Sequence, residues 1–408
     1  MDILRHGLLA LIALGIVACG GSAEPPPQEP EAAAPPPEAA IPVTVAEPVE
    51  IRDQVELTPE GKIIWTPDIW KNPPRGLPIF PNPRPNPMSV EKVELGRMLF
   101  FDKRLSADGT VSCASCHSPT LGFSNALPVS PGIGGQVGTR NAPTIYNVAY
   151  GNEMFWDGRA STLEHQATGP ITNPIEMGNT MPNFLDTLSQ IPEYRTLYRK
   201  AFDNRKIMAW SLARALAAFE RTILTGNAPY DRFKAGSENA MSPAARRGLE
   251  IFEGKGRCAI CHIGANFTDN QFHNVGIGTQ REEPDVGRMG LTKKEKDWSR
   301  FKTPTLRNVA VSGPYMHDGS VRTLEEVVEH YDKGGIPNKN LDPLYQPLGL
   351  TGEEKSNLVA FLKEGLTREI EIPVPTYPPT AVAEEAVSDA EEGEGDSAPE
   401  PSPEDGAM

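Results

Sequence analysis

Cysteine is scarce in this sequence, with five residues in a chain of 408. Four of the five lie in two short motifs, and the fifth, Cys19, stands alone near the N-terminus. No cysteine is left to form a disulfide within the body of the chain. We therefore expect side-chain packing and the groups that the two motifs bind to hold the fold together.

Basic charge is also limited, because 39 Lys and Arg residues oppose 54 Asp and Glu residues. The acidic excess lies in the end regions. Residues 20–50 contain six Glu and no Lys or Arg, and residues 384–408 contain ten acidic residues and no base. The stretch between them is close to neutral and has no basic stripe, so we expect no nucleic-acid partner.

The N-terminal apolar run, Leu8–Val17, is too short to cross a bilayer as a permanent helix. It follows Arg5 and is typical of a signal peptide. The residues Ile16-Val17-Ala18-Cys19 resemble a bacterial lipobox, which predicts a lipoprotein signal over residues 1–19 and lipidation of Cys19. A plain secretory signal cleaved near Ser22 is the alternative.

A lipidated Cys19 predicts a periplasmic protein that contacts a membrane through its lipid anchor only. The several acyl chains of a bacterial lipoprotein are enough for stable anchoring. Gly20, where an Asp would retain a lipoprotein in the inner membrane, favours the outer membrane by analogy with known lipoproteins.

Proline, alanine and glutamate dominate both end regions, a composition that cannot bury a hydrophobic core. We expect a linker over residues 20–62, with its Pro25-Pro26-Pro27 and Pro35-Pro36-Pro37 runs, and an acidic disordered tail over residues 374–408. The linker is interpreted either as a tether that holds the protein away from the membrane or as an unselected spacer.

Helical patterns dominate the body of the chain. Ser89 is the predicted cap of a helix over residues 90–101, and Ser242 is the predicted cap of a similar helix that ends at Glu253. Further helices are expected over residues 207–224 and 353–364, and capping boxes at Thr323 and Thr351. No hairpin signal is strong enough to predict a major sheet.

The run Cys113-Ala114-Ser115-Cys116-His117 is typical of c-type haem attachment, in which two thiols bind the haem vinyls and the histidine binds the iron. The same pattern returns at Cys258-Ala259-Ile260-Cys261-His262. A zinc site needs four ligands and a redox dithiol needs no histidine, and chance is a poor explanation for two complete copies. We therefore predict two covalently bound haem c groups.

Each of these motifs follows a predicted helix, as at the start of a cytochrome c domain, so the sequence contains an internal repeat. We expect a mainly α fold with two cytochrome c-like helical domains, each with one covalent haem, and disordered Pro/Glu-rich termini. The N-terminal domain is assigned to residues 63–235. The C-terminal domain is assigned to residues 236–373.

Several further motifs resemble the bacterial dihaem cytochrome c peroxidase family, which includes MauG. They are Thr139-Arg140-Asn141-Ala142-Pro143-Thr144, Phe155-Trp156-Asp157-Gly158-Arg159, Asn173-Pro174-Ile175-Glu176-Met177-Gly178, Pro304-Thr305-Leu306-Arg307-Asn308 and Gly313-Pro314-Tyr315-Met316-His317-Asp318-Gly319-Ser320. Together with Gln166 they occur in the order of the family and at compatible spacings, and the match as a whole covers roughly residues 89–366.

The resemblance implies that the first haem is the peroxidatic one. Glu176 matches the distal acid–base residue, Gln166 the distal glutamine, and Trp156 the tryptophan between the haems. Peroxide cleavage needs a proton to move from one oxygen to the other, and a carboxylate in an apolar pocket has a pKa raised towards that task. Without this context, Glu176 would be interpreted as a solvated loop carboxylate and Trp156 as an ordinary buried aromatic.

The resemblance also implies a calcium ion between the haems, bound by Asn141 and by carbonyl oxygens of Ser312 and Pro314. Ser312 departs from the family in its side chain. Other polar side chains near these motifs are expected to bind haem propionates or, for the histidines, buried carbonyls: His165, His273, His317, Arg159 and Arg307.

Two departures from the family pattern indicate a MauG-like subgroup. Other members place a histidine ligand of the first haem in the loop before Asn141, where this sequence has Ile133, so we predict a five-coordinate first haem. Tyr331 replaces the methionine ligand of the second haem, as in MauG, with His330 and Met316 as rival ligands. A phenolate stabilises oxidised iron, whereas methionine raises the potential.

These features predict a dihaem peroxidase that reduces hydrogen peroxide at the first haem, with electrons passing from the second haem through Trp156. The electron source is either a small redox protein or an oxidised residue of a partner protein, and Tyr331 favours the second. Gly256-Arg257 stand where MauG has its exit tryptophan, which puts that exit route in doubt. A non-enzymatic dihaem electron carrier is the alternative from another class.

Overall fold

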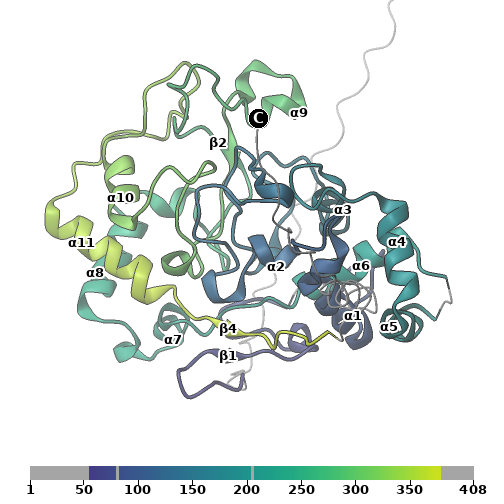
Figure 1. Ribbon diagram of the computed structural model, residues 1–408. Coiled ribbons are helices and arrows are strands. Elements are labelled where there is room, and N and C mark those ends of the chain that lie inside the picture. The colour runs from purple at the N-terminus through teal and green to yellow at the C-terminus, as the bar shows by residue number, and fades with distance from the viewer. Residues whose placement is uncertain (1–54, 80–81, 204–205, 378–408) are drawn as a thin grey trace, which may run out of the picture. The chain divides into compact units, whose positions relative to one another are not determined.

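The computed structural model describes residues 55–79, 82–203 and 206–377. Two pairs of packed α-helices organise these residues. In Figure 1, α1 and α6 lie on one side of these residues, and α8 and α11 lie on the other. The predicted lipoprotein signal with Cys19, and most of the predicted linker and tail, fall outside the described residues.

The described part of the chain is mainly helical, as predicted. Its α-helices are α1 (Val90–Phe101), α2 (Cys113–Cys116), α3 (Leu163–Thr172), α4 (Met181–Gln190), α5 (Pro192–Phe202), α6 (Ala209–Glu220), α7 (Pro229–Lys234), α8 (Pro243–Glu253), α9 (Met289–Thr292), α10 (Leu324–Asp332) and α11 (Gly352–Ala360). None of these helices is both long and apolar enough to cross a bilayer. The strands are β1 (Ile63–Ile64), β2 (Phe272–His273), β3 (Phe301–Lys302) and β4 (Ile370–Glu371), which pair as β1 with β4 and β2 with β3.

Glycine lets the backbones of each helix pair come into contact. A Cβ atom at Gly96 of α1 would lie 1.9 Å from the carbonyl oxygen of Ala215 on α6. In the second pair, a Cβ atom at Gly248 of α8 would lie 1.9 Å from the carbonyl oxygen of Asn357 on α11. The two halves of the protein therefore repeat the same helix packing.

The predicted helix starts are confirmed. The side chains of Ser89 and Ser242 each accept a hydrogen bond from a backbone N–H three residues further on, and Pro243 occupies the first position of α8. The capping boxes predicted at Thr323 and Thr351 are also present. These local signals fix where α1, α8, α10 and α11 begin.

Two helix ends differ from the prediction. The helix expected over residues 207–224 is α6, which ends at Glu220 because the backbone N–H and the hydroxyl of Thr222 both donate to the carbonyl of Phe219. This shorter hydrogen-bond span tightens the chain out of the α-helix. The helix expected over residues 353–364 starts as α11 and closes with a π-helical turn over Phe361–Gly365.

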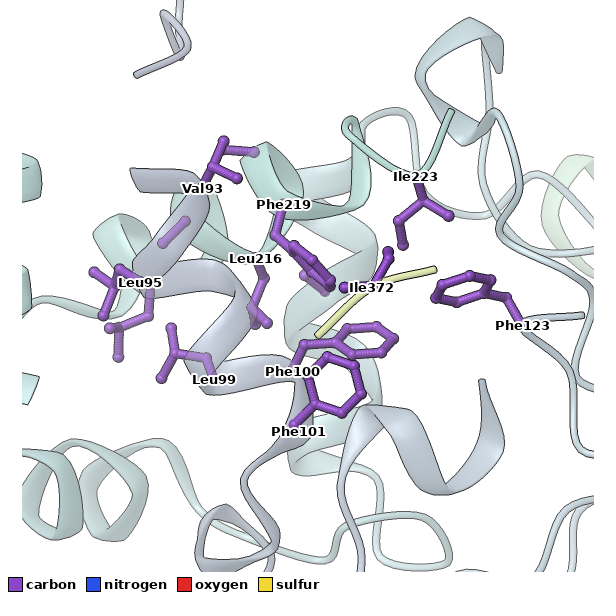
Figure 2. Packing of buried hydrophobic residues seen from close by; sticks show 14 of the residues in the cluster. Val93, Leu95, Leu99, Phe100, Phe101, Phe123, Leu216, Phe219, Ile223 and Ile372 are labelled. Carbon is purple, nitrogen blue, oxygen red and sulfur yellow. The ribbon is translucent and has the colours of Figure 1, made fainter. Parts of the chain in front are cut away.

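The larger hydrophobic core joins the first helix pair to the last described segment of the chain. Phe100, Phe101 and Phe219 pack against one another with ring centroids between 5.1 and 6.2 Å apart. Ile372 lies among these side chains in Figure 2, although it follows the second haem motif by more than a hundred residues. Strand β4 brings it there by pairing in parallel with β1.

The second core is built around α8, α10 and α11, and the ring of Phe252 packs edge-on against those of Phe267 and Phe361. Tyr230 of α7 also packs against this core. The predicted division after residue 235 assigns Tyr230 to the first domain, and that division stays a prediction.

The described residues extend into both predicted end regions. Leu57, within the predicted linker, forms a β-bridge with Ile63. Tyr377, within the predicted tail, donates its hydroxyl hydrogen to the carbonyl oxygen of Met98 over 2.6 Å. Residues 55–62 and 374–377 are therefore packed against the body of the protein.

Candidate functional site

Both Cys-x-x-Cys-His motifs fold into a tight turn that ends at the histidine, the first in α2 and the second at Cys258–Ile260. Nδ1 of His117 lies 3.1 Å from the carbonyl oxygen of Phe123, and Nδ1 of His262 lies 2.9 Å from that of Phe267. When Nδ1 carries the proton and donates to a carbonyl, Nε2 is free to bind a metal. Both imidazoles are thus held as iron ligands would be.

Each motif opens onto a cavity with mainly apolar walls. The first cavity has about 1560 Å³ of space free of protein atoms, part of it open to solvent, and the second has about 1310 Å³. The first is lined by every residue predicted for the peroxidatic site: Cys113, Cys116, His117, Trp156, Gln166 and Glu176. The second is lined by the predicted second set: Cys258, Cys261, His262 and Tyr331.

These donor sets fit a covalently attached haem in each cavity. Two thiols and an oriented imidazole stand at the wall of a largely apolar space, which is what c-type attachment requires. Cys113, Cys116 and His117 would hold the first haem, and Cys258, Cys261 and His262 the second. The sequence motifs and the cavities therefore agree on the same kind of group.

Trp156 lies between the two cavities and lines both. The other shared lining residues are Asn141, Pro143, Lys302 and Pro304. The indole Nε1 of Trp156 donates to the carbonyl oxygen of Asn141 over 2.9 Å, and the Trp156 carbonyl accepts from the N–H of Lys302 over 2.8 Å. The indole is thereby fixed in the wall that separates the two sites.

Gln166 and Glu176 reach the first cavity from α3 and from the turn that follows it. The carbonyl of Asn173 fixes this turn by accepting from the N–H groups of Glu176 and Gly178, over 3.1 and 2.9 Å. Burial raises the pKa of the Glu176 carboxyl, although the positive charge of Arg159 and a hydrogen bond with Asn173 oppose the shift. The result is a carboxylate with increased proton affinity, as proton transfer requires.

An open cleft adjoins the first cavity. The cleft and the cavity share four lining residues: Phe155, Arg159, Pro170 and Glu176. The Arg159 guanidinium lies over the Phe155 ring, 3.4 Å from its centroid. Glu176 therefore stands at the boundary between the cavity and the solvent, where a small molecule and protons can reach it.

In the loop before Asn141, the side chain of Ile133 does not line the first cavity. Ile133 packs against Gly178, where a Cβ atom would lie 2.0 Å from Ile133 Cδ1. Between residues 131 and 138, the lining residues are Gly132 and Gly138, which have no side chain to ligate a metal. The replacement of histidine by isoleucine thus leaves this wall without a ligand.

The internal repeat extends well beyond the haem motifs. The pattern Asp-Gly-x-x-x-Thr-Leu-Glu occurs at residues 157–164 and again at residues 318–325, and its threonines cap α3 and α10 in the same way. Pro170 is the eighth residue of α3 and Tyr331 the eighth of α10, and both line their cavities. Pro170 thus occupies in the first site the position that Tyr331 occupies in the second. Because proline has no side-chain donor or acceptor, this position offers no ligand in the first site.

Tyr331 and one of its rivals, Met316, line the second cavity. The other rival, His330, is not among the lining residues, and its buried Nε2 has no hydrogen-bond partner. Burial raises the pKa of the Tyr331 hydroxyl far above its usual range. An ionised Tyr331 would therefore need a cation or a hydrogen-bond donor at its oxygen.

The three residues predicted to bind calcium, Asn141, Ser312 and Pro314, all line the second cavity. The side-chain amide of Asn141 donates to the carbonyl oxygens of Leu127 and Pro128, over 2.9 and 3.3 Å. The three predicted ligands thus line the same cavity, and the calcium site stays a prediction.

Two of the expected propionate partners are engaged elsewhere. Nδ1 of His273 lies 2.7 Å from a carboxylate oxygen of Asp342, and its Nε2 lies 3.0 Å from one of Asp269. The guanidinium of Arg307, 1% exposed, forms two hydrogen bonds of 2.7 and 2.8 Å with Asp231. Carboxylates thus occupy both side chains: Asp342 and Asp231 come from distant parts of the sequence, whereas Asp269 lies four residues before His273.

The other expected partners differ in their surroundings. His165 is exposed at the open cleft, and His317 is buried with its ring stacked on Phe301, 3.6 Å between centroids. Arg159 lines the first cavity, where it pairs with Asp157 over 3.0 Å. Arg159 is thus the one of these five side chains that lines the first cavity, and its positive charge acts on Glu176.

Two cavity residues were not singled out from the sequence. Lys302 lines both cavities, its Nζ donates to the carbonyl of Glu153 over 2.6 Å, and burial lowers the pKa of its ammonium to about 8. Tyr345 lines the second cavity beside Tyr331. Lys302 could have been noticed from its place two residues before the Pro304 motif, whereas Tyr345 lies in a loop without a pattern.

Comparison with known proteins gives consistent matches. Residues 90–239 match the sequence profile of the di-haem cytochrome c peroxidase family. The chain is 42% identical over 301 residues to the methylamine utilization protein MauG of Methylorubrum extorquens, covering 73% of this chain and 84% of that one. It is 37% identical over 325 residues to the cytochrome-c peroxidase IdrP1 of Denitromonas iodatirespirans, covering 72% and 86%.

Among solved structures, a MauG-like protein associated with microbial copper homeostasis matches with a TM-score of 0.66 and 34% sequence identity, covering 73% of this chain and 93% of that one. The fold and the two cavities fit a c-type dihaem protein. The chain belongs to the dihaem cytochrome c peroxidase family, which includes MauG. This family is one of oxidoreductases with two haem c groups, and the family prediction is confirmed.

Proposed function

We propose that the protein reduces hydrogen peroxide in the first cavity and uses the second site to oxidise a residue of a partner protein. The observation that carries the proposal is the difference between the two repeated sites. The first cavity has Pro170 and Glu176 and is reached by an open cleft, whereas the second has Tyr331 at the position equivalent to Pro170.

Glu176 and Gln166 carry the peroxide chemistry of this proposal. A haem held by Cys113, Cys116 and His117 would supply an iron site open to peroxide. Glu176 accepts a proton from one peroxide oxygen and returns it to the other, which leaves as water. Gln166 orients the peroxide by hydrogen bonding from α3. The oxygen atom that remains takes up two electrons and two protons and becomes the second water molecule.

The second site passes oxidising equivalents outward in this proposal. His262 and Tyr331 would hold the second iron between a nitrogen and an anionic oxygen. An oxygen donor stabilises oxidised iron, which fits the oxidation of a protein side chain better than electron uptake from a high-potential carrier. Trp156, in the wall shared by the two cavities, is the relay between them.

Rapid mixing of the oxidised protein with one equivalent of hydrogen peroxide tests this function. We expect loss of peroxide together with a fast change in the haem absorption, and a much slower reaction in Glu176→Gln. The competing function is a non-enzymatic dihaem electron carrier. A spectrum that stays unchanged after peroxide addition would support the carrier and exclude the peroxidase.

The electron source is a separate question with its own measurement. Steady-state peroxide consumption with a reduced small cytochrome c or cupredoxin measures use of a redox-protein donor. Mass spectrometry of co-purified or genomically neighbouring proteins after peroxide treatment detects an oxidised residue. We expect slow turnover with the small carriers and a new oxidation in a partner protein.

We also propose that the protein is periplasmic and lipid-anchored through Cys19, and that it binds calcium through Asn141, Ser312 and Pro314. Labelling with a fatty-acid analogue should mark the wild type and not Cys19→Ala. Removal of calcium by a chelator should lower peroxide turnover, and calcium, not magnesium, should restore it.

A further inference from the structure

Lys302 stands in the wall that the two cavities share, and two contacts fix it there. Its backbone N–H donates to the carbonyl oxygen of Trp156 over 2.8 Å. Its ammonium Nζ donates to the carbonyl oxygen of Glu153 over 2.6 Å. The main chain and the side chain of Lys302 are therefore both tied to residues 153–156, the segment that carries the proposed relay.

The ammonium of Lys302 forms no ion pair with a carboxylate of the described residues. Glu153, whose negative charge acts on this ammonium, forms its own ion pair with Arg288 over 3.1 Å. The Glu153 carbonyl is neutral and takes one of the three N–H donors of the ammonium. Because a buried charge without a counter-charge is costly, this ammonium is suited to pair with an anion in one of the cavities.

The two cavities differ in the cations at their walls. The first is lined by Arg140, Arg159 and Lys302, whereas Lys302 is the only Lys or Arg among the described residues that line the second. Arg140 is already paired with Asp157 and Asp285, over 2.6 and 2.7 Å. An anion in the second cavity therefore has Lys302 as its nearest source of an unmatched positive charge.

Histidines at the second cavity do not replace this charge. The two ring nitrogens of His273 lie 2.7 and 3.0 Å from carboxylate oxygens of Asp342 and Asp269, so any positive charge on His273 is already matched. The ring of His317 stacks on that of Phe301. Lys302 thus remains the cation of this wall.

We infer that Lys302 is the propionate partner of the second haem: its ammonium pairs with a propionate carboxylate of that haem, and from the shared wall its charge also acts on the first haem. This inference rests on haem attachment in the second cavity, which is part of the proposed function. It is independent of ligation by Tyr331 and of the peroxide chemistry. Hydrogen bonds between an ammonium and a carboxylate are short and strong, because both groups are charged.

The charge of Lys302 should raise the reduction potential of the second haem. Reduction adds an electron to the haem, and a nearby positive charge stabilises the reduced form. Loss of this charge should therefore lower the potential. The first haem keeps Arg140 and Arg159 at its cavity, so its potential should fall by less.

Redox titration of both haems in the full-length haem-loaded protein measures this effect. In Lys302→Met, the reduction equilibrium of the second haem should shift towards the oxidised form by about tenfold, which is about 59 mV for a one-electron couple. Lys302→Gln, a second neutral variant, should show the same fall. Lys302→Arg keeps the charge and should restore most of the wild-type potential.

Infrared difference spectra between the oxidised and reduced protein, with ¹³C-labelled haem propionates, test the ion pair itself. The propionate carboxylate band should shift in Lys302→Met and stay close to its wild-type position in Lys302→Arg. Lys363→Met is the matched control, because it removes the same charge from an exposed lysine that pairs with Glu325 over 2.6 Å. Neither the potentials nor the propionate band should change in this control.

Two outcomes would overturn the inference alone. One is a wild-type potential of the second haem or an unmoved propionate band in Lys302→Met. The other is an equal fall in Lys363→Met. Haem content, measured by mass spectrometry of the purified protein, separates these results from failure of the proposed function. A protein without a haem at Cys258 and Cys261 would refute the function and this inference together.

Discussion

Pro170 holds in α3 the position that Tyr331 holds in α10. The two residues line equivalent cavities, and their helices are capped by equivalent threonines. Tyr331 has an oxygen that can bind a metal, and Pro170 has no such atom. This difference therefore distinguishes two sites that the same local sequence pattern builds.

Replacement of Pro170 by histidine should close the first site. Residue 170 already stands at the cavity wall, so an imidazole there gives the first haem a sixth ligand. In the resting protein, the high-spin EPR signal should disappear and the reaction with peroxide should slow markedly. Pro170→Ala has no donor and should retain the high-spin signal. High-spin signals in both variants would show that position 170 does not control ligation.

Glu176 should give the peroxide reaction a pH dependence. The ionised carboxylate accepts the proton, so the rate falls as the pH drops through the pKa of Glu176. Because burial raises this pKa, the fall should lie at a higher pH than for an ordinary glutamate. Glu176→Gln should lower the rate constant by about 10²- to 10⁴-fold and remove this pH dependence. The control is Glu193→Gln, on the exposed side of α5, which should behave like the wild type.

Gly96 and Gly248 should each be intolerant of a methyl group. Alanine is the better helix former, but its Cβ would overlap a carbonyl oxygen of the facing helix in both places. We expect Gly96→Ala and Gly248→Ala to lower the free energy of unfolding by about 1–3 kcal/mol or more. Gly352→Ala in α11, where the added Cβ meets no atom within 4 Å, is the matched control and should be neutral or stabilising in thermal unfolding.

The buried pair of Arg307 and Asp231 should contribute strongly to stability. Loss of one partner leaves an uncompensated charge in the interior, so Asp231→Asn should cost about 3–5 kcal/mol in denaturant unfolding. The exposed pair of Lys363 and Glu325 offers the comparison. Glu325→Gln should cost no more than about 1 kcal/mol. Similar losses in the two variants would contradict the structure around Arg307.

Local signals in the sequence predicted the helix starts well, because a cap needs only a few neighbouring residues. Ser89, Ser242, Thr323 and Thr351 all cap the helices expected of them. The repeat that aligns Pro170 with Tyr331 was also readable, since it depends on spacing alone. The grouping of the first-site residues around one cavity was expected from the resemblance to the family and not from these local signals.

Long-range contacts were not readable in the same way. Arg307 was expected to bind a propionate, but Asp231 lies 76 residues away and no local pattern marks it as the partner. Tyr345 stands in an irregular loop, and its ring meets Tyr331 only because Asp332 and Asp342 hold that loop in place. Such pairings are set by packing, which the sequence does not display.

The parallel pairing of β1 with β4 ties the beginning of the described chain to its end. During synthesis the N-terminal half emerges long before Ile370 and Ile372, which fill its core. That core stays incomplete until the whole body has been made, so the two halves are expected to fold together. A fragment cut after the first half would expose aromatic side chains instead of folding as a small cytochrome of its own.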